Sequence, residues 1–169
     1  MAASCPATIT ALLLSVLAPA SVAAAADEAP GRWEGTTRDC LLVRHTADAA
    51  PARRSSCQLL RVDQRERGLL TVRFVSDAQL TLEHITFAGV LVGRTMALRC
   101  RQERCQLMEP IQLRVNAVGQ SAVNLATPGS STGMLQATVA QGHCRLSRRK
   151  VQCEAVARGG SRWLATASL

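Results

Sequence analysis

Hydrophobic and polar residues alternate along several stretches of this chain, and this alternation is its clearest structural signal. Leu70, Val72 and Phe74 are separated by Thr71 and Arg73. The same period of two recurs within 96–100, 111–116, 151–158 and 162–169. Such a pattern is typical of antiparallel strands that bury one face and expose the other. Beyond residue 26, no apolar stripe with a helical period extends over more than two turns.

Residues that favour turns lie between the alternating stretches, at 65–68, Gly93, Gly119, 128–133 and 158–161. We therefore expect an all-β fold, an antiparallel sandwich or barrel of about 8–10 short strands. No linker divides residues 27–169, so they are expected to form a single β domain.

The first 26 residues carry no charged side chain. An apolar run over 9–18 ends at Pro19, and Ala24-Ala25-Ala26 fits the small-residue pattern of a cleavage site. We expect residues 1–26 to be a cleaved signal peptide and the mature chain to begin near Asp27, in the periplasm or outside the cell. The alternative is an uncleaved anchor, because residues 5–26 are long enough to span a bilayer.

Loss of the signal peptide would remove Cys5 and leave six of the seven cysteines, an even number that favours disulfides in an exported chain. A hairpin turning at residues 147–150 would place Cys144 opposite Cys153. The same construction pairs Cys100 with Cys105 and, across a longer loop, Cys40 with Cys57. The alternative is a metal site, but these spacings lack the C-x2-C pattern of zinc knuckles, so no metal or cofactor is expected.

One catalytic pattern is present, because Gly129-Ser130-Ser131-Thr132-Gly133 matches G-x-S-x-G with Ser131 as the nucleophile. That arrangement needs a strand before it and a helix after it, whereas the residues that follow favour a strand. A Gly- and Ser-rich loop is therefore the favoured interpretation. With no histidine pair at metal spacing and no phosphate-binding loop, we expect a non-enzymatic domain and keep a serine hydrolase as an alternative.

Gly31-Arg32-Trp33 precedes the first expected strand and resembles the G-x-W that opens lipocalin-type barrels. The resemblance covers three residues. It implies a second alternative, a small barrel that holds an apolar ligand. The competing interpretation is a Trp that anchors one end of any barrel or sandwich.

Charge gives the main functional indication, with 20 basic and 12 acidic residues and a net charge of +8. Basic residues cluster at predicted turns, which in an up-and-down meander would place them on both rims. The candidate binding residues are Arg53, Arg54, Arg101, Arg104, Arg148, Arg149 and Lys150. They favour attraction to a polyanion, such as an anionic envelope polymer or lipid surface. Four aromatic residues offer little for stacking on single-stranded nucleic acid. The alternative is that solvated turns simply tolerate charge.

Overall fold

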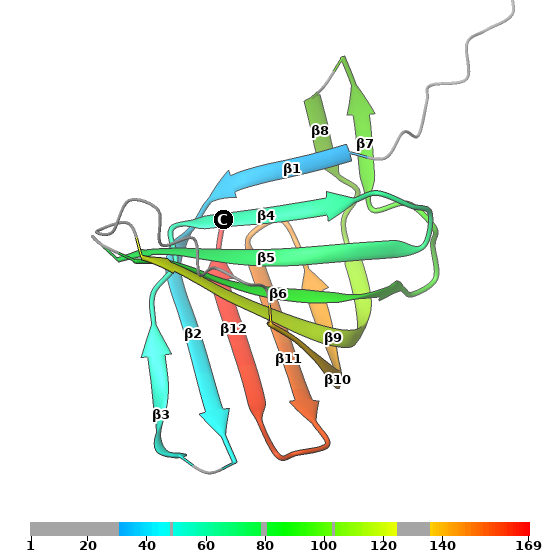
Figure 1. Ribbon diagram of the computed structural model, residues 1–169. Helices are drawn as coiled ribbons and strands as arrows, with labels where there is room; N and C mark the ends of the chain where they lie inside the picture. Colours follow the sequence, from blue (N-terminus) through cyan, green and yellow to red (C-terminus); the bar gives the residue numbers. More distant parts are fainter. Residues whose placement is uncertain (1–30, 48, 79–80, 103, 125–135) are drawn as a thin grey trace, which may run out of the picture.

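The computed structural model describes residues 31–47, 49–78, 81–102, 104–124 and 136–169, and within them the chain forms only strands and turns (Figure 1). The all-β prediction is therefore confirmed. The strands are β1 (Gly31–Thr36), β2 (Arg38–Thr46), β3 (Ala49–Ser55), β4 (Leu59–Gln64), β5 (Leu69–Ala78), β6 (Thr81–Leu91), β7 (Leu98–Arg101), β8 (Arg104–Leu107), β9 (Ile111–Asn124), β10 (Gln136–Leu146), β11 (Lys150–Ala157) and β12 (Arg162–Ser168). None of these described segments is a helix long and apolar enough to cross a membrane.

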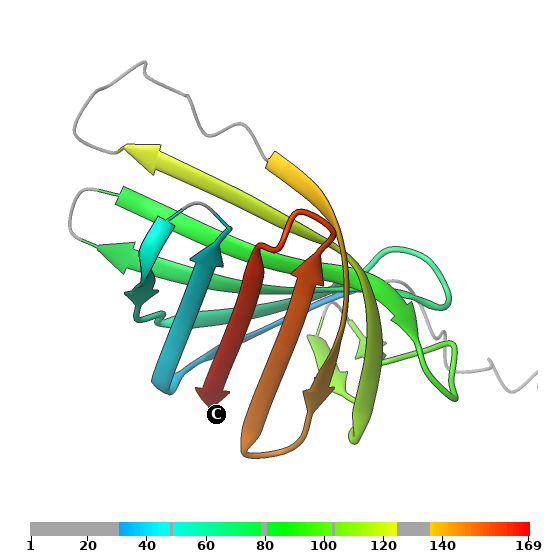
Figure 2. The same cartoon turned by 90° about the horizontal axis from the view of Figure 1, so that it is seen from below.

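Ten strands form one antiparallel sheet in the order β1-β4-β5-β6-β9-β10-β11-β12-β2-β3, and β7 and β8 form a separate hairpin. Only Thr37 separates β1 from β2, although these strands pair with different parts of the sheet. The sheet therefore curls until its two halves meet at this bend, as Figure 2 shows. The Thr37 N–H donates to the Gln58 carbonyl at 2.8 Å, and the Cys40–Cys57 disulfide lies beside it.

The connections between strands fall at two ends of the curled sheet. Residues 65–68, 92–110 and 147–149 lie at one end, where Leu113 is paired with Leu91 and Ile111 with Leu146. We call this the hairpin end, because the β7–β8 hairpin is inserted there. The turn at 158–161 lies at the opposite end, together with the paired strand ends Thr46 with Ala49, Ala78 with Thr81, and Thr81 with Asn124.

The interior is filled by the apolar residues that the alternation placed on one face. Val151, Cys153 and Ala155 are buried along β11, while Gln152 between them is exposed. Phe74 and Phe87 pack edge to face, with ring centroids 5.9 Å apart and planes at 81°. Trp163 is also buried, 2% exposed, so these three aromatic side chains pack inside the sheet.

All three predicted disulfides are present. Cys144 lies opposite Cys153 in the β10–β11 register, and Cys100 opposite Cys105 in the β7–β8 register. Cys40 and Cys57 join the β2 and β3–β4 segments, with Cα atoms 5.2 Å apart. Three disulfides suggest an oxidising environment.

The predicted turns were correct in three places and wrong in one. The turns at 65–68 and 158–161 and the bend at Gly93 are all present, with Gly68 at φ 79° and Gly160 at φ 83°. Glycine tolerates this left-handed conformation, which explains why it stands at these turns. Gly119, in contrast, is buried inside β9, where it pairs with Thr86 and Ala137. The predicted loop at 128–133 lies outside the described residues.

Candidate functional site

The structure groups most of the predicted basic residues at the hairpin end. Arg101 and Arg104 flank the tip of the β7–β8 hairpin, and the run from Arg148 to Lys150 connects β10 to β11. The prediction that basic clusters occupy both rims was therefore wrong for these groups. It was wrong because residues 96–107 form an inserted hairpin within one connection and add no strand to the main sheet.

Arg53 and Arg54 do not join this group. The prediction put them at a turn, but both lie inside β3, opposite Arg44 and Val43 of β2. Arg53 is paired with Glu83 at 2.6 Å, and Arg54 is exposed. The structure thus separates these two residues from the other five candidates.

The segments that connect the strands of the main sheet differ strongly in charge. The hairpin-end segments 65–68, 92–110 and 147–150 contain nine basic and three acidic residues, a net charge of +6. The turn 158–161 and the sequence stretches 47–48, 79–80 and 125–135 together contain one of each, Arg158 and Asp48, and carry no net charge. Most of the net charge of the chain, +8, is therefore concentrated at the hairpin end.

The β10–β11 turn holds its basic residues outward on a rigid frame. The Ser147 N–H donates to the Lys150 carbonyl at 2.9 Å, and the Lys150 N–H donates back to Ser147 at 3.3 Å. The Leu169 N–H donates to the Arg149 carbonyl at 3.1 Å, which ties the turn to the end of the chain. The Arg148 side chain is 94% exposed, with the Glu109 carboxylate 4.0 Å from its Nε.

A groove of about 390 Å³ separates this turn from the inserted hairpin. Three guanidinium groups line it, from Arg94, Arg99 and Arg148, together with the single carboxylate of Glu109. Arg94 Nη1 donates to the Met108 carbonyl, which fixes its position. Because positive charge exceeds negative charge here, the groove suits an anionic group.

The inserted hairpin is held against the sheet by Gln64 of β4, which is 1% exposed. Its Oε1 accepts the Ala97 N–H at 2.8 Å, and its Nε2 donates to the Thr95 carbonyl at 2.7 Å. On the other side, the Cys100–Cys105 disulfide packs directly against Gly31 of β1. A Cβ at this position would overlap its sulfur atoms, so the close approach of the hairpin to β1 depends on glycine. These contacts fix the segment that carries Arg94 and Arg99.

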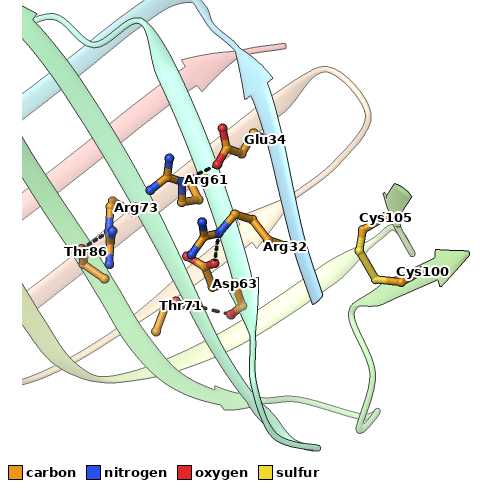
Figure 3. A network of polar contacts seen from close by, with 9 residues as sticks. All are labelled: Arg32, Glu34, Arg61, Asp63, Thr71, Arg73, Thr86, Cys100 and Cys105. Atoms are coloured by element: carbon orange, nitrogen blue, oxygen red, sulfur yellow. Dashed lines mark hydrogen bonds and ion pairs between the residues drawn. A yellow bond between two sulfur atoms is a disulfide. The ribbon is translucent and has the colours of Figure 1, made fainter. Parts of the chain in front are cut away.

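Other arginines are engaged in a polar network on the outer face of β1, β4, β5 and β6 (Figure 3). Arg32 Nε lies 2.5 Å from Asp63, and Arg61 Nε lies 2.7 Å from Glu34. The hydrogen bond and charge of Asp63 raise the pKa of Arg32 above its usual value. These carboxylates neutralise the two arginines, so this face is less suited to a polyanion than the hairpin end.

Arg73 and His84 complete the outer face without a carboxylate partner among the described residues. Arg73 Nε donates to Thr86 Oγ1 at 3.2 Å. Burial, and then the charges of Arg73 and Arg61, lower the pKa of His84 below its usual value. His84 is therefore held in its neutral form over a wider pH range than a free histidine.

The interior offers little to the alternative of an apolar ligand. The apolar core residues pack together, and the cavity bounded by β2, β3, β6, β9 and β10 has mostly polar walls. Trp33 of the G-x-W tripeptide is partly buried against the core. Ser131 lies outside the described residues, and within the described ranges no three His, Cys, Asp or Glu side chains are grouped as a metal site.

Comparison with known proteins gives no relative. No family model, no curated protein and no solved structure matches this chain. The fold and its charge distribution are therefore the basis for any functional proposal.

Proposed function

We propose that this protein is a non-enzymatic binding domain of the periplasm or extracellular space whose hairpin end binds an anionic polymer. The observation that supports this proposal is the charge asymmetry between the connecting segments, +6 in the hairpin-end segments against no net charge in the turn 158–161 and the stretches 47–48, 79–80 and 125–135. The three disulfides agree with an oxidising compartment such as the periplasm or the extracellular space.

A polymer fits this surface better than a single small anion. The basic residues stand on three separate connections of a rigid sheet, so repeated negative charges can contact several of them together. Each neutralised charge on the polymer releases a counterion, which makes multivalent binding strong at low salt. Phe74, Phe87 and Trp163 are buried and Trp33 is partly buried against the core, so this surface offers little for recognition by base stacking.

Retention on immobilised heparin tests the proposal directly. The parent protein is expected to remain bound at physiological ionic strength and to elute as salt is raised. The triple variant Arg148→Gln, Arg149→Gln, Lys150→Gln should elute at lower salt. The slope of log affinity against log salt should fall by up to about three, close to one for each sulfate or carboxylate that is no longer neutralised. Exposed turn substitutions of this kind should change stability by less than about 0.5 kcal/mol.

A matched control removes the same charge from the opposite end, through Arg54→Gln, Arg158→Gln and Arg162→Gln. This control should keep most of the retention. Equal losses in the two triple variants would mean that net charge alone is responsible, and absence of retention by the parent protein would end the proposal. Anionic vesicles in place of heparin distinguish a lipid surface from a polymer.

A further inference from the structure

A second site lies at the opposite end, where the sheet is open between two groups of strands. A cavity of about 230 Å³ is bounded by side chains of β2 and β3 on one side and of β6, β9 and β10 on the other. The ends of these strands gather at the upper left of Figure 2. The cavity is thus formed by rigid strands that come from distant parts of the sequence.

Two arginines stand side by side in this cavity. Arg44 of β2 and Arg53 of β3 are directly opposed in the register, and both line the cavity. Like charges in directly opposed positions destabilise a sheet unless something compensates them. Glu83 compensates one of them, because its Oε1 lies 2.6 Å from Arg53 Nη2.

Arg44 has no such partner among the residues that the structure describes. Its Nε is buried, and no acceptor among the described residues bonds to it. Two guanidinium groups and one carboxylate give the cavity one excess positive charge; His84 also lines it, and burial lowers the pKa of its imidazole. A buried donor of this kind, next to excess positive charge, suits a negatively charged oxygen of a ligand.

The remaining walls of the cavity present both polar and apolar side chains to a ligand. Gln120 and Gln136 are register partners whose amides line the cavity, and Ser55 and Ser121 also line it. Leu42 and Ile85 provide an apolar patch. At about 230 Å³ the cavity is smaller than pockets that hold drug-sized ligands, which begin at about 300 Å³.

We propose that this cavity binds a short-chain carboxylate, with its carboxylate on Arg44 and its alkyl chain against Leu42 and Ile85. The ligand supplies the negative charge that Arg44 does not find among the described residues, and it covers the apolar patch. This site is independent of the hairpin end, because it lies at the other end of the sheet and shares no residue with it.

The test is a titration with butyrate, followed by backbone amide NMR, with neutral butyramide as the matched probe. Butyrate is expected to bind in the millimolar range and to shift amides near Arg44, Arg53 and Gln120. Butyramide should bind at least about tenfold more weakly, because a hydrogen bond to a charged group contributes more than one to a neutral group.

Variants then test whether the guanidinium group of Arg44 binds the butyrate carboxylate. Arg44→Gln should weaken butyrate binding by about tenfold or more, whereas Arg54→Gln, which removes an equal charge from the same end, should leave it unchanged. If Arg44→Gln does not fold, Arg44→Lys keeps the charge but loses Nε, and it should still weaken binding. The hairpin-end triple variant should bind butyrate as the parent does.

Three results would overturn the proposal. They are the absence of butyrate-induced shifts in the parent protein, equal binding of butyramide, and an equal loss in Arg54→Gln. Retention on heparin is measured separately, so failure here leaves the proposed function standing, and the reverse also holds.

Discussion

Replacing Gln64 with Leu should detach the inserted hairpin from the sheet, because this buried side chain is its main polar link to β4. The change keeps a similar volume and removes two short hydrogen bonds, with Ala97 and Thr95, besides the longer contacts of Nε2 to the Glu66 carbonyl at 3.3 Å and to Met96 Sδ at 3.7 Å. The Ala97 N–H would lose its acceptor, the Oε1 atom 2.8 Å away. The Thr95 carbonyl would keep one partner, since the Gly68 N–H also donates to it at 2.7 Å.

The expected loss of stability follows from these two hydrogen bonds. A buried N–H left without an acceptor costs about 1–3 kcal/mol, and removal of the bond to Thr95 adds about 1 kcal/mol. Gln64→Leu should therefore destabilise the protein by about 2–4 kcal/mol. Gln152→Leu on the exposed face of β11 is the control, expected within about 0.5 kcal/mol of the parent.

Urea unfolding measures the stability loss, and hydrogen exchange locates it. In Gln64→Leu the Ala97 amide should lose protection beyond what the global loss of stability explains, while the β11–β12 amides follow the global change. An unchanged urea midpoint, or unchanged protection at Ala97, would refute the idea that Gln64 holds the hairpin.

Two further predictions concern stability. The folded state lowers the pKa of His84 below the value of about 6.5 that it has in the unfolded chain. As the pH falls below about 6.5, the unfolded chain therefore binds a proton at His84 more readily than the folded protein does. The free energy of unfolding that is present above this pH is lost as the pH falls through the folded pKa. His84→Gln should reduce this pH dependence in thermal unfolding between neutral and acidic pH, and an unaltered profile would contradict the assignment. Replacing both Cys144 and Cys153 with Ala should cost about 2–3 kcal/mol, from the short loop they close across 9 residues, and a urea midpoint equal to the parent's would contradict this.

The strands and disulfides were predictable because they depend on local pattern. Alternation along 151–157 fixes which residues face the core, and counting outward from a turn at 147–150 places Cys144 opposite Cys153. Neither inference needs knowledge of distant segments. Both were confirmed.

The arrangement of the basic residues was not predictable in the same way. Residues 96–107 alternate as a meander strand would, and only the pairing of β6 with β9 shows that they are an insertion. That pairing joins segments far apart in the chain. Which end of the sheet each turn occupies therefore depended on long-range pairing that the local pattern does not contain.

The cavity at the opposite end was missed for a related reason. Arg53 and Arg54 resembled turn residues, and Arg44 was not among the candidate binding residues. One signal was available, because Leu42 and Arg44 are two residues apart and so share the inward face of β2. A charged residue in phase with a core position indicates an inward-facing polar site.

The most direct test of the central proposal is to map where a polyanion contacts the protein. Backbone amide NMR during titration with a short heparin oligosaccharide should shift residues 65–68, 92–110 and 147–150 together, and added salt should reverse the shifts. Residues 158–161 at the opposite end should not move. Shifts centred on the opposite end, or spread evenly over the surface, would contradict the account.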